Sequence, residues 1–524
     1  MAETTPYSVT QWDTLHKNGP FDLKLLLKTE LAGNANNNNA IALYNDASDE
    51  IRRLIGEAVA NGEGFRAYGS RWSMSNIAHQ KDRMHINTFM NIDIPVSDTD
   101  MHTNTTYANE NVFFFQCGNT ISEISQALAR YGKSLKTSGA SNGQTIAGCI
   151  STGVHGSGLD IGSVQDYVIG LNLIIGDKPE DVVYIERASR PVLNDAFAAK
   201  LNSRVIRDDK LFNVALVGLG AFGFIHGVVL EAENRFLLKR YVRKIDKNIA
   251  LDLANTMDFS NSNFKIDEEV DANNKPLRPW HYKVFINPYV NDTQYVVEAI
   301  YKKDYATPYP DPFTKIQQSI YTDLIYLLIK ISEKYPKTIP FFIKRLEKQI
   351  LPEVDEQTIG TLYETFWNAK YKGPAFAFSF GVDHSNSSKA LEALVKLTKD
   401  KGPIPGIYAM RFVKQSEATL AFTKFPITCM IEIDGIQWKG TSKLPSMEKF
   451  SELMIDTLKA KNIDFTIHWG KNAQWDYPNL CEHMFGDKVD DWKSEREKLL
   501  RPEMLRVFSN TFLEMTKLNH ELIV

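Results

Sequence analysis

The hydrophobic positions near the N-terminus change twice between strand-like and helix-like spacing. Residues 40–44 form a short apolar run, which is typical of a strand. Apolar residues in the segment 51–59 then recur at helical spacing, and Gly62 is a typical helix stop. Residues 65–68 again read as a strand. The pattern therefore predicts a strand–helix–strand opening.

A second unit of mixed character begins near residue 111. The run VFFFQC predicts a buried strand, and Thr120 with Glu123 forms a capping-box signature for a helix that Gly132 ends. Further strands are expected within 166–175, at 182–185 and at 227–232. Strands and helices of this kind predict an α+β fold.

The pattern changes again near residue 234. Residues 240–465 mix β runs (WHYKVFI, FAFSFGV and TCMIEI) with helical segments. The stretch 316–335 is strongly apolar with helical spacing, and Pro336 and Pro340 interrupt it. A helix on a membrane surface has this pattern, but so does a helix that covers the substrate side of a cap domain, which we favour.

Size and composition restrict the functional class. A chain of 524 residues is too long for one ordinary core, so two or more domains are expected. A formal net charge of -4 indicates no nucleic-acid partner. The four cysteines include no CxxC pair, so no metal site is expected. The N-terminus lacks a signal-peptide pattern and no apolar run reaches membrane-spanning length, so we expect a cytoplasmic protein without a membrane span. Oligomeric state is not predicted.

Residues 218–223, GLGAFG, match the pattern GxGxxG. A Rossmann dinucleotide fingerprint follows a strand and opens a helix. Here the preceding LFNVALV looks helical, and the following FIHGVVLEAE looks like a strand. The order is reversed, so a Rossmann site is disfavoured.

The segment 138–158, SGASNGQTIAGCISTGVHGSG, is a long loop rich in glycine, serine and threonine. Such a loop exposes many backbone N–H groups and approaches a pyrophosphate or an aromatic ring closely. A flexible linker would have a similar composition, but Ile146, Ile150 and Val154 need burial. Ordered long loops inside a domain are usually functional, so we favour cofactor binding.

A third segment, RAYGSRWSMS at 66–75, carries a strand into Gly69 and Ser70. A turn of this kind presents amides to a phosphate group. Taken alone, an ordinary strand-ending turn explains it equally well.

Taken in order, these segments resemble the FAD-binding domain of the vanillyl-alcohol oxidase / p-cresol methylhydroxylase (VAO/PCMH) family. Within that family, QTIAGCISTGVHGSG and the motif His468-Trp-Gly-Lys471 are most similar to the sugar alcohol and aldonolactone oxidases. The resemblance implies a two-subdomain PCMH-type FAD-binding domain at 1–235, a mixed α/β cap that holds the substrate at 236–465, and a segment 466–524 that returns to the FAD-binding domain.

The resemblance also implies positions for the cofactor. Those expected to bind FAD are Gly69, Ser70, Arg71, Trp72 and Ser73 at the pyrophosphate, Gly139, Thr145, Gly148, Ser151, Thr152, His155 and Gly156 around the flavin, and Phe224 and Ile225 at the adenine half. Many members attach FAD to a histidine in the pyrophosphate turn, where this chain has Trp72. Members with a cysteinyl link carry cysteine where this chain has residues 139–142. We therefore expect non-covalent FAD, with His155 as a second candidate for attachment.

Catalysis in the sugar oxidases depends on a Glu-x-Arg pair and on the lysine of the HWGK motif. Arg411 matches the arginine, but Ala409 stands where the glutamate is expected. We expect Arg411, Lys471 and His468 to be catalytic. Glu432 and Asp434 are candidates for the missing carboxylate, although both equally fit solvent-facing strand positions. Gln437 and Glu432 are expected to face the substrate.

The implied function is oxidation of an alcohol (CH–OH) by hydride transfer to flavin N5. Gly139 matches the position beside flavin C4a, where a small residue admits oxygen, so oxygen is the expected electron acceptor. The partner is then a small-molecule substrate. A hydrophobic or secondary-metabolite substrate, with oxidase or dehydrogenase chemistry, is the first alternative. A flavin-binding protein with little redox turnover is the second.

Overall fold

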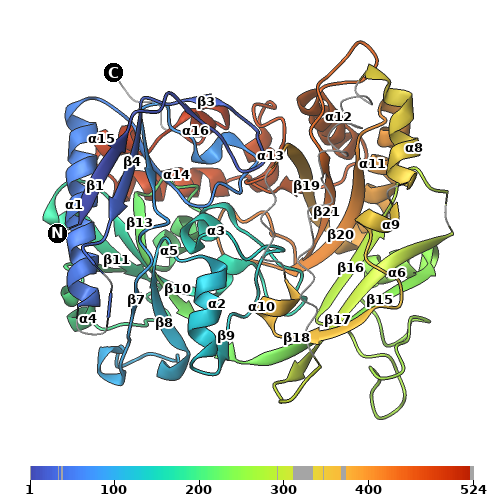
Figure 1. The fold of residues 1–524 in the computed structure, drawn as a ribbon, viewed down its shortest axis with the longest axis horizontal. Helices are drawn as coiled ribbons and strands as arrows, with labels where there is room; N and C mark the ends of the chain where they lie inside the picture. Colours follow the sequence, from blue (N-terminus) through green and yellow to red (C-terminus); the bar gives the residue numbers. More distant parts are fainter. Residues whose placement is uncertain are drawn as a thin grey trace.

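The computed structural model describes residues 2–33, 35–36, 39–291, 293–310, 334–345, 347–366 and 373–519. Figure 1 shows two masses of sheet and helix side by side, with the C-terminal helices returning to the N-terminal side. The apolar helix expected at 316–335 lies outside the described residues up to position 333. Among the helices described, none is both long enough and apolar enough to span a bilayer.

The first domain begins with a four-stranded sheet. Its strands, in spatial order, are β1 (Glu3–Tyr7), β4 (Leu25–Glu30), β6 (Arg83–Ile86) and β5 (Phe65–Tyr68). The pairs β4–β6 and β6–β5 are parallel, and β1 is antiparallel to β4. The strand expected at 65–68 is confirmed, and it carries the chain directly into the turn at Gly69.

A six-stranded sheet completes this domain. Its order is β12 (Arg204–Arg207), β11 (Val182–Glu186), β10 (Val168–Ile174), β13 (Phe224–Glu231), β8 (Val112–Gln116) and β7 (Asp93–Ile94). The expected strands near 112, 166, 182 and 227 are confirmed. Helix α5 (Asp209–Leu216) ends before the glycines at 218–223, and β13 follows them. This helix-then-strand order is not that of a Rossmann fingerprint.

Helix α1 (Ala40–Ala60) contacts both β7 and β10. The strand expected at 40–44 is wrong, because those residues form the first turns of this helix. A short apolar run does not by itself distinguish a strand from the start of a buried helix. Leu43 and Tyr44 are buried and begin the stripe that Ile51 and Leu54 continue.

Helix α2 (Ile121–Ala129) begins at the expected capping box. Thr120 Oγ1 accepts a hydrogen bond from the Glu123 amide at 3.2 Å, and the Glu123 carboxylate accepts one from the Thr120 amide at 2.7 Å. The following glycine-rich segment is not loop throughout, because residues within it form helix α3 (Ile146–Thr152). Gly153, at φ +69°, ends this helix in the left-handed conformation.

The second domain is built on an eight-stranded antiparallel sheet, the cap sheet. Its order is β18 (Gln357–Gly360), β15 (Phe236–Asp246), β17 (Gln294–Asp304), β16 (His281–Ile286), β20 (Gly406–Lys414), β21 (Ile427–Ile436), β19 (Ala375–Asp383) and β22 (Phe465–Ile467). The β runs predicted in the sequence are β16, β19 and β21, so these strands are confirmed.

One face of the cap sheet is covered by helices. These are α6 (Lys247–Thr256), which contacts β15 and β17, and α11 (Ser387–Lys401), which contacts β19 and β21 and packs against α12 (Met447–Ala460). Tyr282 points toward α6 and donates a hydrogen bond to the Ala250 carbonyl at 3.4 Å. Successive strand residues face opposite ways, so His281 and Lys283 point to the other face, toward the first domain.

The C-terminal segment packs on the first domain. Helices α13 (Leu480–Phe485), α14 (Lys488–Leu499), α15 (Pro502–Val507) and α16 (Thr511–Met515) form it. Arg496 of α14 donates to the Ala221 carbonyl at 2.8 Å. The division at 235 and 465 stays a prediction; β15 begins at Phe236, whereas β22 at Phe465–Ile467 still pairs within the cap sheet.

Candidate active site

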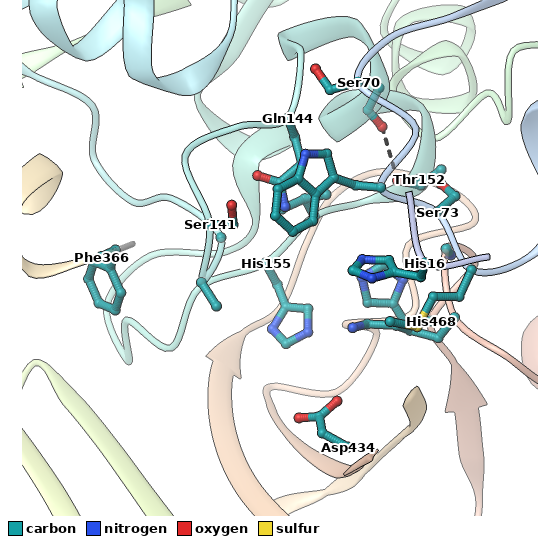
Figure 2. Close-up of a pocket in the computed structure, with 18 of the residues that line it drawn as sticks. His16, Ser70, Ser73, Ser141, Gln144, Thr152, His155, Phe366, Asp434 and His468 are labelled. Atoms are coloured by element: carbon teal, nitrogen blue, oxygen red, sulfur yellow. Dashed lines mark hydrogen bonds between the residues drawn. The ribbon is translucent and has the colours of Figure 1, made fainter. Parts of the chain in front are cut away.

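A cavity of about 1020 Å³ lies between the two domains, at the upper end of the usual range for small-molecule sites. The first domain contributes the turn after β5, helix α3 and the segment before β13. The cap sheet and residues 468–471 form the other side. Figure 2 shows His155, His468 and Asp434 pointing toward one another from these different elements. The cavity therefore depends on segments distant in sequence.

The turn Gly69 to Ser73 lines one end of the cavity. Within the described part of the chain, its backbone amides have no protein acceptor, whereas the Arg71 carbonyl accepts from the Leu15 amide at 2.8 Å. Arg71 has φ +63°, a conformation that turns successive amides the same way. Free amides with this arrangement fit an anionic group such as a pyrophosphate.

Helix α3 lines the cavity next to this turn. Thr145, Gly148, Ser151 and Thr152 all contribute to the lining. A Cβ atom added at Gly69 would lie 2.0 Å from Thr145 Oγ1, so only glycine allows the turn and the helix to approach this closely. Thr145 Oγ1 is buried and has no hydrogen-bond partner among the described residues. A close backbone approach and an unsatisfied hydroxyl both fit a bound cofactor.

The segment 219–225 lines the far end of the cavity together with Arg66. The Arg66 guanidinium donates to the carbonyl of Leu219 and, more weakly, to that of Gly220 at 3.5 Å. Burial, followed by the charge of Arg496, lowers its pKa to about 9. Phe224 and Ile225 also line the cavity here, and their contact with the adenine half of FAD stays a prediction; Arg66 was not anticipated from the sequence.

His155 lies at the centre of the cavity with a defined tautomer. Its Nδ1 lies 2.9 Å from the Gly156 carbonyl, which only accepts, so Nδ1 carries the proton and Nε2 has the lone pair in the neutral ring. Nε2 is buried with no hydrogen-bond partner in the described structure, 3.8 Å from Glu432 Oε1. Burial, and next the charge of Arg411, lowers the pKa of His155 to about 3, so the ring is neutral near pH 7.

The cap sheet places Glu432 beside the alanine that replaces the expected glutamate. Ala409 on β20 is in register with Glu432 on β21. Arg411 binds the Glu432 carboxylate through two nitrogens, with Nε at 2.6 Å from Oε2. Burial raises the pKa of Glu432, and the charge and hydrogen bonds of Arg411 lower it. The effect of Arg411 is the larger, so the pKa lies far below its usual range. Arg411 lines the cavity, and Glu432 lies directly behind it.

Asp434 is the carboxylate of β21 that reaches the cavity itself. Its side chain is open to the cavity although it lies deep between the domains. The Asp434 carboxylate makes no hydrogen bond or ion pair with another described residue, although its backbone pairs within the sheet. Burial and the neighbouring charge of Glu432 raise its pKa, while Lys471, Lys283 and Arg411 act in the opposite direction. Asp434 is thus an unpaired carboxyl group in a functional position.

The HWGK motif follows β22 and enters the cavity. The Gly470 amide donates to His468 Nδ1 at 3.0 Å, which leaves the proton of the neutral ring on Nε2. The His468 ring stacks on Phe422 with centroids 4.4 Å apart. Burial, and then the charge of a protonated His155, lowers the pKa of His468. Lys471 lines the cavity beside it.

Three expected site residues do not line the cavity: Glu432, which lies behind Arg411, and also Gln437 and Gly156. Gln437 lies just beyond β21, where the strand alternation ends, and its amide donates to the carbonyls of His16 and Ala375 at 2.9 and 3.0 Å. Gly156 is covered by Thr137 and Ser138, and a Cβ atom there would lie 2.3 Å from Thr137 Oγ1. Gly156 acts on the site through its carbonyl, which orients His155. Neither Gln437 nor Gly156 faces the cavity in this structure, and their contact with a ligand stays a prediction.

Several charged residues on the cavity side of the cap sheet were not anticipated: Arg240, His281, Lys283 and Glu298. For His281 and Lys283 the signal in the sequence was the alternation of polar and apolar residues in HYKVFI. That alternation was used to predict a strand but not to ask which polar side chains share a face. His16 also lines the cavity, and burial together with Lys471 lowers its pKa to about 4.

Two family models match the chain. Residues 40–177 match an FAD binding domain, and residues 260–515 match D-arabinono-1,4-lactone oxidase. The L-gulono-1,4-lactone dehydrogenase of Mycobacterium tuberculosis is 22% identical over 466 residues, covering 88% of this chain and 92% of that protein. The D-arabinono-1,4-lactone oxidase of Kluyveromyces lactis is 25% identical over 40% of this chain and 37% of its own length.

Solved structures share the fold. Cholesterol oxidase from Brevibacterium sterolicum superposes with a TM-score of 0.69 at 11% identity, covering 98% of this chain and 97% of that one. A VAO-type flavoprotein from Myceliophthora thermophila gives a TM-score of 0.59 at 11% identity, covering 92% and 78% of the two chains. The matched FAD domain contains both α3 and the turn after β5, whose free amides and unsatisfied hydroxyl fit FAD. The chain thus combines an FAD binding domain with a D-arabinono-1,4-lactone oxidase domain, and its fold is that of the VAO-type flavoproteins.

Proposed function

We propose that the protein oxidises a CH–OH group of a polyhydroxylated small molecule, of which an aldonolactone is the leading example. The observation that carries this proposal is the polar face of the cap sheet beside the FAD site, with Arg411, Asp434 and Lys471 around one space. An aldonolactone is a cyclic ester that keeps all but one of the hydroxyl groups of its sugar acid. The names of the two lactone-oxidising relatives support this substrate class.

When bound, FAD supplies the acceptor for the hydride that leaves the substrate carbon. The hydroxyl proton must leave at the same time. We assign this proton to the free carboxylate of Asp434, because Glu432 is already paired with Arg411. Asp434 thereby replaces the glutamate missing at Ala409.

Three neighbours bind and orient the reacting oxygen in this proposal. Arg411 uses Nε and Nη2 for Glu432, which leaves Nη1 as a donor. His468 provides its Nε2–H, and Lys471 provides an ammonium group. Donors aimed at an oxygen that gains negative charge stabilise it most in a site that excludes water. Glu432 holds Arg411 in place and acts as a positioning residue.

We infer that FAD is held without a covalent link. Trp72 occupies the turn position at which relatives carry the attaching histidine, and its indole lies against Gly143. Cys149 is fully buried within α3, and burial raises the pKa of its thiol. Acid precipitation is expected to release all of the flavin into the supernatant. Flavin that stays with the protein pellet would point to attachment at His155.

We further propose oxygen as the electron acceptor, because Gly139 lines the cavity without a side chain. A Cβ atom at this position would lie 2.7 Å from Val154 Cγ1. Alanine at position 139 therefore requires a smaller residue at position 154 as well. Gly139→Ala with Val154→Ala is expected to slow reoxidation of the reduced enzyme in stopped-flow experiments, relative to Val154→Ala alone. Slow reoxidation of the wild-type protein itself would contradict the proposal and favour a dehydrogenase.

The main test is anaerobic mixing of the oxidised protein with a panel of alcohols. Aldonolactones or alditols are expected to bleach the oxidised-flavin band, whereas sterols and other apolar alcohols leave it unchanged. Bleaching by apolar alcohols alone would favour the hydrophobic-substrate alternative. A yellow colour that persists with every compound would favour a flavin-binding protein with little turnover.

A further inference from the structure

Lys283 occupies the middle of the cap sheet, on the face that lines the cavity. Its register neighbours are Glu298 on β17 and Arg411 on β20. Both neighbours have partners of their own. Glu298 accepts hydrogen bonds from Arg240 at 2.5 Å and from His281 at 3.0 Å, and Arg411 binds Glu432. Lys283 is therefore left out of both pairs.

The Lys283 ammonium group has no acceptor within the described part of the chain. Its Nζ lies 4.4 Å from the centroid of the Phe285 ring, which also lines the cavity. Burial, and after it the charge of Arg411, lowers the pKa of Lys283. The Lys283 side chain is partly buried and opens onto the cavity, and no described residue accepts a hydrogen bond from it there. Such a group is explained most simply by a ligand that supplies the missing oxygen.

The charges around Asp434 indicate what kind of oxygen this is. Four charged groups act on Asp434: Glu432, Arg411, Lys283 and Lys471. Glu432 and Arg411 neutralise each other, which leaves two ammonium groups against one carboxylate. One of these two ammonium groups is therefore left without a carboxylate of its own in this group, and it fits a ligand with a negative or strongly polarised oxygen. The FAD-lining residues lie on the opposite, first-domain side, so the substrate is the molecule in question.

We propose that Lys283 binds a carboxyl-derived oxygen of the substrate, either the ring carbonyl of a lactone or the carboxylate of the open-chain acid. This inference rests on the proposed oxidation of a polyhydroxylated molecule and specifies its substrate class. Asp434 and Lys283 then have separate tasks: one accepts the proton at the reacting hydroxyl, and the other binds the carboxyl end. An alditol has no carboxyl-derived oxygen, so Lys283 does not contribute to its binding affinity.

The test compares three ligands of equal carbon number: an aldonate, its lactone and the corresponding alditol. Dissociation constants are measured anaerobically with the FAD-loaded protein, from perturbation of the flavin spectrum or from the concentration dependence of flavin reduction. Lys283→Met is expected to weaken aldonate binding by roughly ten- to a hundredfold. The lactone is weakened less, because its carbonyl carries only partial charge, and the alditol changes less than about twofold.

Two further variants control the experiment. Lys283→Arg keeps the charge and is expected to restore most of the aldonate affinity. Lys302→Met makes the same chemical change at an exposed lysine that pairs with Glu233 at 2.6 Å, outside the cavity, and is expected to change nothing. Equal flavin content in all variants shows that the fold is retained.

An equal loss for all three ligands, or an unchanged aldonate affinity, would overturn the assignment of Lys283. So would a wild-type protein that binds the alditol but neither carboxyl compound. Failure of the proposed function gives a different result from failure of the Lys283 assignment. In that case none of the three ligands bleaches the flavin. Aldonate binding and its dependence on Lys283 remain measurable in that case from the flavin spectrum.

Discussion

Glu432 and Asp434 are two positions apart on the same face of β21, yet their surroundings differ. Glu432 is bound by Arg411, and this pair outweighs the effect of burial, so its pKa is lowered. Asp434 has no such partner, and burial with the charge of Glu432 raises its pKa. Neighbouring carboxyl groups whose pKa values are driven apart are typical of sites where one group is structural and the other takes part in proton transfer.

Asp434→Asn tests this division. The variant is expected to reduce flavin roughly 10²- to 10⁴-fold more slowly in anaerobic single turnovers, because asparagine accepts no proton. In the wild-type protein, the rate is expected to rise with pH as Asp434 ionises. Its raised pKa places this rise above the pH at which an ordinary aspartate ionises. The variant should lack the rise.

The matched control is Asp355→Asn, which removes a carboxylate whose side chain is 80% exposed outside the cavity. It is expected to leave both the rate and the pH profile unchanged. A pH profile that persists in Asp434→Asn would assign the proton acceptor to another group, of which His155 has the free lone pair.

Among the elements, the approach of the turn after β5 to helix α3 determines the shape of the cofactor site. Gly69 lies against Thr145, the residue that precedes the first turn of α3. No side chain separates the two segments. The free amides of the turn and the hydroxyl of Thr145 therefore share one small volume, which suits a pyrophosphate.

Gly69→Ala is expected to lower the flavin content of the purified protein severely, because the new Cβ atom would lie 2.0 Å from Thr145 Oγ1 and force the turn away from α3. Flavin absorbance relative to protein absorbance measures this loss. Gly56→Ala, in the middle of α1, serves as the control, since alanine is favoured in helices and its Cβ atom would lie 3.3 Å from the Asp177 side chain. Full flavin content in Gly69→Ala would contradict the assigned position of the pyrophosphate.

The sequence predicted elements well where a long periodic pattern or a cap was present. The capping box at Thr120 and the alternating strands of the cap are examples. It failed at α3, because glycine, serine and threonine have weak helix propensity, and the helix is stabilised by burial of Ile146 and Ile150 against the sheet. It failed at Gln437 because β21 ends one residue earlier, so alternation no longer indicates the direction of the side chain.

The candidate site was predicted least well on the cap side. Motifs identified the cofactor segments, since those depend on local backbone shape. The partnership of Arg411 with Glu432 depends on the register of β20 against β21, and the isolation of Lys283 depends on pairs formed two strands away. Such long-range pairings leave no local signal in the sequence.

On the scale of the whole molecule, the C-terminal segment closes the first domain. Asn510 is buried, and its amide donates to the carbonyls of Ile77 at 3.0 Å and His79 at 2.8 Å. Its carbonyl oxygen accepts from the Leu513 amide at 3.1 Å and so caps α16. One side chain thus connects the last helix to the region that follows the cofactor turn.

Asn510→Ala is expected to lower the free energy of unfolding by about 2–3 kcal/mol, because buried carbonyl and amide groups lose their partners. Urea unfolding of the FAD-loaded protein measures the change. Flavin is also expected to dissociate faster, because the hydrogen bonds of Asn510 lie next to the turn that is expected to hold the flavin cofactor. Asn104→Ala, an exposed change on the surface, should have no measurable effect. Unchanged flavin release in Asn510→Ala would show that the segment stabilises the fold without supporting the cofactor.

The hydrogen bond of 2.7 Å between Ser75 Oγ and the Trp469 carbonyl joins residues 394 positions apart, next to the cofactor turn. A ribosome adding 5–20 residues per second needs roughly 20–80 s to make the chain between them. For most of that interval the nascent chain has the glycine-rich segment 138–158 but not residues 468–471, which complete its enclosure. We therefore expect flavin capture to be completed late in the synthesis of this protein, once residue 469 has left the ribosome.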